Sequence, residues 1–283
     1  MQKKNSNLTN AQQIAIEYVK ALSHGGPIDK SMRITLHFHP DRTSYMGHIL
    51  ESMVLTNLYK SQFETSTSNG GLTAHPGGDR WNWESRIFGT AYDNVSPMQR
   101  PKYGSLNYRK DFYGGSPRFG SAYIRLKPAV LTRSTFCYPD SVFEPGAFGT
   151  SEHMSLVSLA KQDDMDLLDD YVEAQVHGDI IVSRDVEAIV LDPSYKGTAV
   201  EELSSKLSCL VEWHSGYELT IADLEKHPNF RGSEFVEIGK EIAKDGRLNP
   251  KILGKATTTG NYNEQDLKKV WHYIARFGRY KQV

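Results

Sequence analysis

A single acid stands among polar residues in the segment DDYVEAQVHGDIIVSRDVEAIVLD, residues 169–192. The segment predicts a strand, a turn at Gly178–Asp179 and a second strand. Because side chains alternate along a strand, one face of the first strand carries four polar side chains, Tyr171, Glu173, Gln175 and His177. The other face is apolar, so the polar face is expected to look into a cleft or into water. Glu173 is then either a functional carboxylate or part of an exposed strand face.

The segment LHFHPDR places His37 and His39 two residues apart at the end of a predicted strand, with Arg42 in the turn that follows. Three interpretations remain open. Two histidines on one face are a common beginning of a metal site. Alternatively, the guanidinium of Arg42 clamps a phosphate or carboxylate through two parallel hydrogen bonds. In the third interpretation the histidines are hydrogen-bonded core residues and Arg42 forms a surface ion pair.

A long segment rich in Gly, Ser, Thr and Asn, QFETSTSNGGLTAHPGGDR, spans residues 62–80. Gly-rich turns present successive backbone N–H groups that bind anions, and Thr65, Ser66 and Asn69 add neutral donors. Phe63 offers a ring for stacking on a flat heterocycle. The composition favours a loop that wraps a nucleotide, although it contains neither a Walker sequence nor a dinucleotide-binding glycine pattern. An ordinary surface loop is the alternative.

Two further segments carry weaker signals. Ser134 and Thr135, in RSTFCYPDS, form a hydroxyl pair on a predicted strand that is able to hold neighbouring residues in place. Five aspartates lie within residues 163–170. Such a run is usually a solvated loop or helix start, and a docking patch for a basic partner is the alternative.

The elements that must position these residues follow from hydrophobic periodicity and capping signals. Helices are predicted at residues 11–24, 47–63, 234–246 and 263–278, the last with Asn263 as its N-cap and Gly278 at its end. Strands are predicted at residues 31–39, 120–126, 129–138, 171–178 and 185–192. Helices first, a mostly antiparallel β core in the middle and helices last are an α+β pattern.

The bulk properties exclude some classes of protein. The chain has 283 residues and a formal net charge of −1, so no basic surplus indicates nucleic-acid or membrane binding. No apolar run approaches the roughly 18 residues of a membrane helix. Two cysteines, Cys137 and Cys209, fit a reducing compartment better than a disulfide framework or a zinc site. The polar N-terminus lacks a signal peptide and suits either a frayed terminus or a leader for a non-cleaving export machine.

Three features in chain order resemble the pattern of the ADP-ribosyltransferase superfamily: Arg42 after an early strand, Ser134–Thr135 on a later strand and Glu173 on a strand further on. From about Arg33 to Tyr217 the chain also resembles a narrower group, the bacterial effectors of the CteC type. The segments that carry this resemblance are HFHPDR, QFETSTSNGG, RPKYGSLNYR, VEAQVHG and DVEAIVLDPSY.

The resemblance implies an architecture in three parts. Residues 31–197 would form an ADP-ribosyltransferase-like catalytic core of two packed, mostly antiparallel sheets. Residues 1–30 would be a helical segment before that core. Residues 198–283 would be a helical part packed on the core, and a candidate docking surface for a protein substrate.

The resemblance also implies an activity. It is that of a mono-ADP-ribosyltransferase, which cleaves NAD and transfers ADP-ribose to a protein, a threonine of host ubiquitin in the CteC group, and so blocks ubiquitination. The implied catalytic residues are Glu173, Arg42 and Phe63. The co-substrate NAD is held by a wider implied set: Arg42, His39, Phe63, Thr65, Ser66, Asn69, Ser134 and Thr135. The implied setting is a secreted bacterial effector that acts in the host cytoplasm, with no nucleic acid or membrane as partner.

The sequence departs from the superfamily pattern in two places. A Ser-Thr-Ser triplet stands at residues 66–68, too soon after Arg42, whereas Ser134–Thr135 lacks the third hydroxyl. Either segment is therefore a candidate for bracing the site. Tyr171 stands two residues before Glu173, where enzymes that modify arginine have Gln or Glu, and this leaves a hydroxyl acceptor open.

Chemistry explains why one acid suffices for this reaction. Glycosidases usually need two carboxylates, one of them to protonate the leaving group. Nicotinamide is already cationic in NAD and leaves as a neutral ring, so no general acid is needed. A carboxylate that accepts a hydrogen bond from the ribose 2′-hydroxyl stabilises the positive charge that grows on the sugar. His177 and His39 are candidate bases for a threonine acceptor.

Two rival functions remain beside this one. The first is a metal-dependent hydrolase built on His37 and His39. The second is a catalytically inactive binding module that grips a partner through the helical last third of the chain.

Overall fold

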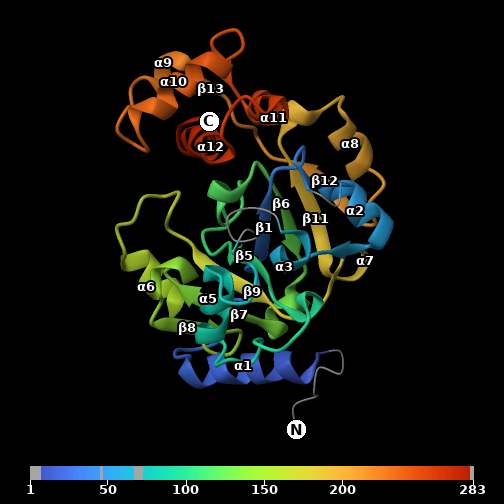
Figure 1. Ribbon diagram of the computed structural model, residues 1–283. Coiled ribbons are helices and arrows are strands. Elements are labelled where there is room, and N and C mark those ends of the chain that lie inside the picture. The colour runs from blue at the N-terminus through green and yellow to red at the C-terminus, as the bar shows by residue number, and fades with distance from the viewer. Residues whose placement is uncertain (1–7, 45–46, 67–72, 281–283) are drawn as a thin grey trace.

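The computed structural model describes residues 8–44, 47–66 and 73–280, and an eight-stranded sheet lies at its centre (Figure 1). The strands follow the order β12-β11-β6-β1-β5-β9-β7-β8 across the sheet. Their bounds are β1 Ile34–Phe38, β5 Lys102–Leu106, β6 Ala122–Leu126, β7 Ser134–Tyr138, β8 Ala147–Thr150, β9 Val172–Val176, β11 Val186–Leu191 and β12 Leu210–Trp213. All neighbours are antiparallel except β11 and β12, which are parallel. The predicted α+β class with a mostly antiparallel core is confirmed.

Hydrogen bonding corrects two finer expectations. The expectation of two separate packed sheets is wrong. Strands β5 and β9 pair along their whole length, and this pairing joins all eight strands into one hydrogen-bonded sheet. The strands predicted on either side of Gly178 exist as β9 and β11, but β6, β1 and β5 lie between them. Gly178 has a φ of +76°, a backbone conformation that favours glycine, where the chain turns after β9. Strand β10 (Ile180–Ile181) and helix α7 (Val182–Asp185) then lead into β11.

Helices surround the sheet at its ends and on its faces. Their bounds are α1 Asn10–Leu22, α2 Ile49–Thr56, α3 Gln62–Thr65, α5 Asp79–Ile87, α6 Leu156–Gln162, α8 Ala199–Ser204, α9 Ile221–Leu224, α10 Ser233–Ile242, α11 Pro250–Thr259 and α12 Glu264–Phe277. Short 3₁₀ turns stand at η1 Pro97–Gln99, η2 Pro117–Phe119, η3 Pro128–Arg133, η4 Ser141–Phe143 and η5 Pro193–Tyr195. Three two-stranded ribbons pair β4 Leu58–Tyr59 with β10, β2 Thr43–Ser44 with β3 Gly47–His48, and β13 Leu219–Thr220 with β14 Arg247–Leu248.

The two faces of the sheet differ in chemistry. One face is apolar and contributes Leu36, Ile124, Phe136, Val172 and Ala174 to the main hydrophobic core. Burial of this face supplies the largest favourable contribution to folding, at about 25 cal/mol per Å² of apolar surface. The opposite face of β5, β7 and β9 is polar, and it is buried as well. The expectation that the polar face of β9 looks into a cleft or into water is therefore wrong, because the chain covers it.

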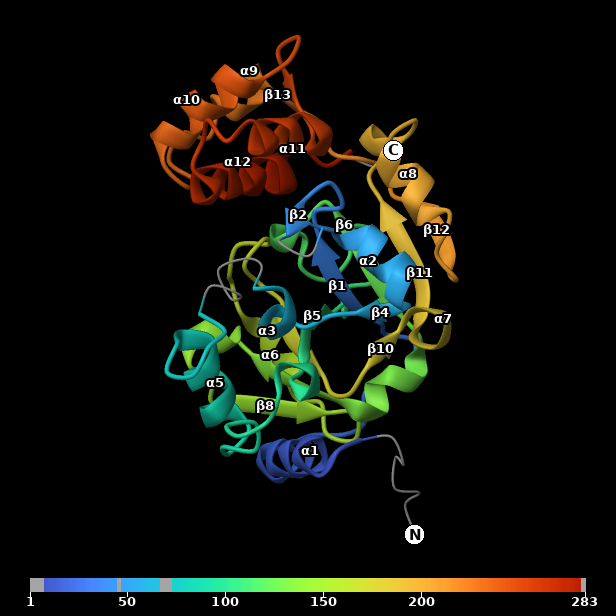
Figure 2. The same cartoon turned by 45° about the vertical axis from the view of Figure 1, so that its right-hand side comes forward.

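Helix α1 lies at one end of the sheet and the C-terminal helices lie at the other, as Figures 1 and 2 show from two directions. The side chain of Thr9 caps α1, so the helix begins at Asn10, one residue before the predicted range of 11–24. Ala15 and Val19 of α1 pack with Phe88 and Tyr92, which follow α5, in a small separate core. The predicted N-terminal helical segment is thus a helix packed on the end of the sheet.

A second hydrophobic core is built around α12, mostly from residues after Tyr217, with Tyr113 and Leu168 added from earlier in the chain. Asn263 caps α12 and Gly278 ends it, as predicted. The indole Nε1 of Trp271 in α12 donates to the carbonyl of Pro117 in η2 at 2.9 Å. Strand β12 still belongs to the main sheet, so the helical C-terminal part begins after Trp213 and not at residue 198.

The acidic run at residues 163–170 joins the two cores. Asp166 accepts from Arg276 at 2.8 Å, and Asp169 accepts from Arg118 at 2.5 Å and from Arg231 at 2.7 Å. Arg276 and Arg231 belong to the C-terminal part, whereas Arg118 lies in η2. The basic partner of this run within the described residues is therefore the chain itself, and the interpretation as a solvated loop is wrong for these two aspartates.

Leu36→Ala is expected to lower the free energy of unfolding by about 2–5 kcal/mol, because it leaves a cavity in the main core. Leu36 is fully buried, whereas Leu55 of α2 is 78% exposed. Leu55→Ala is the matched control and should change stability by less than about 0.5 kcal/mol. Urea unfolding followed by circular dichroism measures both. Equal losses in the two variants would contradict the assignment of the core.

Candidate functional site

Glu173 lies in the middle of β9, between Ser105 of β5 and Cys137 of β7. It is 6% exposed. One carboxylate oxygen accepts from the amide of Gln175 at 2.9 Å, and the other accepts from the hydroxyl of Ser141 in η4 at 2.9 Å. Burial above all, together with the charge of Asp140, raises the pKa of Glu173 to about 7, against the opposing charge of Arg80. An acid with this pKa exchanges its proton at neutral pH, which suits acid–base work.

A buried chain of hydrogen bonds fixes Gln175 and so orients Glu173. The Thr135 hydroxyl donates to the Gln175 carbonyl oxygen at 2.8 Å, which leaves the amide hydrogens for Glu173. Since that hydroxyl has one proton, it must accept from His177 Nε2, 2.9 Å away. The other ring nitrogen of His177 then accepts from the Tyr92 hydroxyl at 2.6 Å. Every donor in this chain has an acceptor, so the network holds Glu173 in one orientation.

Arg80, on α5, is the guanidinium that acts on Glu173. Its charge lowers the pKa of Glu173, and the charge of Glu173 in turn raises the pKa of Arg80 against the lowering by burial. The guanidinium lies over the ring of Tyr103, 4.1 Å from its centroid. Its Nε and Nη1 are buried and have no hydrogen-bond partner among the residues that the structure describes. Unpartnered donors of this kind are costly to bury and mark a place where a ligand oxygen would fit.

A second buried acid, Glu84, lies one turn after Arg80 on α5. It accepts from Arg100 at 2.6 Å and from the Tyr103 hydroxyl at 3.0 Å. Burial raises the pKa of Glu84 to about 7, and the charge of Arg100 is the largest opposing contribution. Glu84 and Glu173 thus both act electrostatically on Arg80. The idea of a lone acid is therefore incomplete, because the covered face holds two carboxyls.

Phe63 is connected to Glu84 by Arg100, which contacts both side chains. The Arg100 guanidinium stands over the Phe63 ring, 4.1 Å from its centroid, so one face of that ring is already occupied. Thr65 is the last residue of α3 and its hydroxyl donates to the Ser61 carbonyl. Ser66 ends the helix with a φ of +48° and is exposed. Asn69 lies outside the described residues, as do Thr67 and Ser68 of the Ser-Thr-Ser triplet.

Of the hydroxyl pair on β7, Thr135 belongs to this network and Ser134 does not. Thr135 bonds Gln175 and His177 on the neighbouring strand, whereas Ser134 donates to the carbonyl of Val130 at 2.9 Å. Thr135 therefore acts on Glu173 through Gln175. His177 is held on both ring nitrogens and its pKa is lowered to about 3, first by burial and then by Arg133 and Lys102. It positions Thr135, and it is not the base that the sequence suggested.

Arg42 and His39 lie elsewhere, where the main sheet meets the C-terminal helices. The charges that act on Arg42 come from Glu264 at the start of α12 and from Asp41, and its pKa is lowered by burial above all. The His39 ring packs edge-on against Trp271, with centroids 5.0 Å apart. No contact joins Arg42 to Glu173 in the part of the chain that the structure describes. The two side chains thus make no direct contact, although the charges of Arg42 and of Asp140 both act on Lys268, and that of Asp140 also acts on Glu173.

The metal site suggested by His37 and His39 lacks a set of ligands within residues 8–44, 47–66 and 73–280. His37 contacts backbone groups through both ring nitrogens, the Gly120 carbonyl at 3.2 Å and the Ser116 N–H at 3.3 Å. No group of three or more His, Cys, Asp or Glu side chains gathers there in an arrangement able to hold a metal ion. His37 is instead a hydrogen-bonded residue of the covered face, as the third interpretation of this segment had it.

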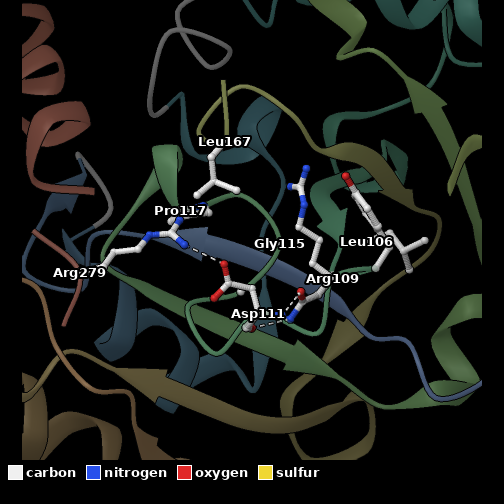
Figure 3. Close-up of a pocket in the computed structure, with 10 residues that line it drawn as sticks. Leu106, Arg109, Asp111, Gly115, Pro117, Leu167 and Arg279 are labelled. Atoms are coloured by element: carbon white, nitrogen blue, oxygen red, sulfur yellow. Dashed lines mark hydrogen bonds and ion pairs between the residues drawn. The ribbon is translucent and has the colours of Figure 1, made fainter. Parts of the chain in front are cut away.

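One small hollow opens near the ion pair between Asp111 and Arg279 (Figure 3). Its volume of about 10 Å³ is room for one water molecule. Leu106, Pro117 and Leu167 are among its lining residues, and Glu173 is not. This hollow is too small for a nucleotide and does not reach Glu173.

The residues that sequence reasoning missed are Arg80, Glu84 and Ser141. Arg80 and Glu84 stand four residues apart on a helix, a spacing that normally indicates a surface ion pair. Instead, Arg80 stacks on the ring of Tyr103 in β5, and Glu84 accepts a hydrogen bond from the same tyrosine. Arg80 closes the segment of residues 62–80 that was singled out for its glycines, so its position was marked although its role was not. No sequence signal pointed to Ser141.

Comparison with known proteins gives a family and no activity. A family model described as "Protein of unknown function (DUF3626)" matches residues 33–164 and 151–277. No curated protein matches the sequence. None of the helices described is both long and apolar enough to cross a bilayer.

The pKa of Glu173 predicts how stability depends on pH. In the folded state that pKa is about 7, above the usual 4.5. Between these values the unfolded chain has released a proton that the folded chain keeps, so the free energy of unfolding falls as pH rises. Glu173→Gln cannot titrate. Between pH 5 and pH 8 its free energy of unfolding should therefore fall by about 2 kcal/mol less than that of the unmodified protein.

Urea unfolding at four pH values between 5 and 8 measures this difference. Glu237→Gln is the control, since the Glu237 side chain is 66% exposed, and its curve should run parallel to that of the unmodified protein. A parallel curve for Glu173→Gln as well would show that Glu173 does not titrate in this range.

Proposed function

We propose a function from the geometry of the chain itself, since the chain belongs to the DUF3626 family, whose description assigns none. The proposed activity is mono-ADP-ribosyl transfer, in which NAD is cleaved and ADP-ribose passes to a hydroxyl group of a protein. The observation that carries it is Glu173, a buried carboxyl held by Gln175 and Ser141 with its pKa raised to about 7.

In the proposed reaction the bond between the ribose C1′ and the nicotinamide nitrogen breaks. The electron pair of that bond stays on nicotinamide, which was cationic and leaves neutral. The oxygen of the acceptor hydroxyl forms a new bond to C1′, and its proton passes to a base. Ionised Glu173 accepts a hydrogen bond from the ribose 2′-hydroxyl, and this bond strengthens as the sugar becomes positive. Glu84 is a second carboxyl on the same face that is able to take a proton at neutral pH.

In this proposal Arg80 is the arginine whose charge acts on Glu173, a role that differs from the hold on NAD that the resemblance implies for Arg42. The charge of Arg80 favours the ionised form of Glu173, which is the form that the reaction requires. Its buried Nε and Nη1 lack partners among the described residues and point to a ligand oxygen as the missing acceptor. Thr135 and His177 support the site from behind by fixing Gln175.

The substrate must reach an acid that is 6% exposed. In this proposal α5, which carries Arg80, and η4, which carries Ser141, separate to admit the nicotinamide ribose. Val142 and Phe143 of η4 are 47% and 56% exposed, so η4 has few packing contacts to lose. Closure afterwards would exclude water, which otherwise competes with the acceptor hydroxyl.

The finer parts of the proposal rest on the resemblance to CteC-type effectors. They are a threonine of ubiquitin as the acceptor, and a secreted bacterial protein that acts in the host cytoplasm. Tyr171, two residues before Glu173, supports a hydroxyl acceptor over arginine, because its hydroxyl donates to Asp140 and offers no carboxylate or amide to a guanidinium.

Glu173→Gln tests the proposed activity directly. The protein is incubated with isotope-labelled NAD and ubiquitin, and the mass of each protein and the release of nicotinamide are followed. The unmodified protein should release nicotinamide and add one ADP-ribose to its acceptor. Glu173→Gln should lower the rate by about 10²–10³, the usual loss for one preorganised electrostatic group. Glu237→Gln should be fully active.

Absence of NAD cleavage with every acceptor tried, including a whole-cell protein extract, would overturn the proposal and favour the inactive binding module. Full activity in Glu173→Gln would remove Glu173 from the mechanism. Activity abolished by a chelator and restored by a metal would favour the hydrolase.

Arg80→Gln should shift the pH dependence of NAD cleavage. Arg80 lowers the pKa of Glu173 while Asp140 raises it, so removal of the guanidinium leaves the acid protonated to a higher pH. The rising limb of the rate against pH should move up by about one pH unit. Arg86→Gln is the matched control on the same helix, because Arg86 pairs with exposed Glu144. A loss of rate with no shift in the profile would mean that Arg80 acts through packing alone.

A further inference from the structure

A cluster of positive charge lies between η2 and α12, outside the set of residues assigned to Glu173. Its members, called the cationic cluster below, are Arg118, Arg231, Lys268, Lys269 and His272. They come from three separate parts of the chain: η2, the segment before α10, and α12. Trp271, the neighbour of His272, bonds the carbonyl of Pro117 next to Arg118, which fixes η2 and α12 together.

The two arginines of the cationic cluster share one acid. Asp169 accepts from Arg118 on one oxygen and from Arg231 on the other. Each guanidinium keeps further donors, and the Nε of both is buried with no partner in the described parts of the chain. One aspartate therefore satisfies only part of the hydrogen-bonding capacity of the two arginines.

His272 is the second observation that points to a missing group. It is fully buried, and both ring nitrogens lack a hydrogen-bond partner among the described residues. Lys268 stands four residues before it, on the same side of α12. Burial above all, together with the charges of the four cationic residues of the cluster, lowers the pKa of His272 to about 2. A buried imidazole without partners is costly, because it has lost its bonds to water.

The charges of the cationic cluster do not balance. Among the described residues, Asp169 is the one acid hydrogen-bonded to its arginines, and Asp140 acts on Lys268 from the side of Glu173. Burial lowers the pKa of Lys268 to about 8, with Arg118, Lys269 and Arg42 as further causes. Like charges held this close repel one another unless an anion lies between them.

We propose that the cationic cluster binds the diphosphate group of a nucleotide. Two guanidinium groups supply planar pairs of donors, the arrangement that matches phosphate oxygens. The two lysines and the one N–H of the neutral His272 ring add donors from a third element, more than a single phosphate requires. A diphosphate carries enough charge and enough oxygens to engage all three elements at once.

The position of the cluster fits a ligand that also reaches Glu173. Phe119, next to Arg118, packs edge-on against Tyr171 with centroids 5.4 Å apart. Tyr171 donates to Asp140, whose charge acts on Glu173. Few side chains thus separate the cluster from the acid. That the nucleotide is NAD rests on the proposed function, whereas binding of a diphosphate does not.

Isothermal titration of the full chain with inorganic diphosphate, ADP, ADP-ribose and adenosine tests the site. The three diphosphates should bind, increasingly weakly as salt rises, and adenosine should not. Lys268→Gln combined with Lys269→Gln should weaken the three by about tenfold or more, since each lysine gives charge-assisted hydrogen bonds. Lys244→Gln combined with Lys255→Gln, at two exposed positions, is the control and should bind as the unmodified protein does.

The ligand-free melting temperature shows whether the variants fold. The cluster variant should melt no lower than the unmodified protein, because it loses two mutually repelling charges. Diphosphate binding without cleavage of NAD would uphold the site and reject the proposed function. NAD cleavage with no diphosphate binding, or with equal binding by both double variants, would overturn the site and leave the proposed function standing.

Discussion

A polar sheet face that is covered by the chain must satisfy its own hydrogen bonds, and this constraint organises the molecule. Glu173, Gln175, Thr135 and His177 are each nearly or fully buried, so water cannot replace a missing partner. Their bonds have one consistent direction, from the Tyr92 hydroxyl to the carboxylate. The same constraint makes the partnerless nitrogens of Arg80 conspicuous, because each buried unpaired donor costs about 1–3 kcal/mol.

Sequence reasoning succeeded where local pattern decides structure. The alternation of residues 171–177 correctly divided β9 into an apolar and a polar face, and Asn263 and Gly278 correctly bounded α12. It failed where distant segments decide. Whether the polar face meets water depends on α5, which comes about ninety residues earlier in the chain, and no local signal reports that cover. The single sheet also depends on the pairing of β5 with β9, which are far apart in sequence.

In the candidate site, too, local pattern identified some residues, whereas others depend on contacts between distant segments. Glu173 and Thr135 were identified from strand position and residue type, and Thr135 does hold the residue that orients Glu173. Arg42 was chosen because it follows an early strand, but the acids whose charges act on it are Glu264 of α12 and Asp41, and Glu173 is not among them. Arg80 and His272 could not be found in this way, since what distinguishes them is the absence of partners in the folded state.

The acidic run at residues 163–170 has a consequence for synthesis. The main sheet is complete once β12 has been made, at Trp213, and domains fold in order as they emerge. Two arginines that neutralise this run, Arg231 and Arg276, come later. Asp169 and Asp170 already have Arg118 and Arg109 at that stage, whereas Asp166 lacks its partner Arg276 until α12 leaves the ribosome. A chain that stops before α12 would therefore leave Asp166 without its counter-charge beside a finished sheet.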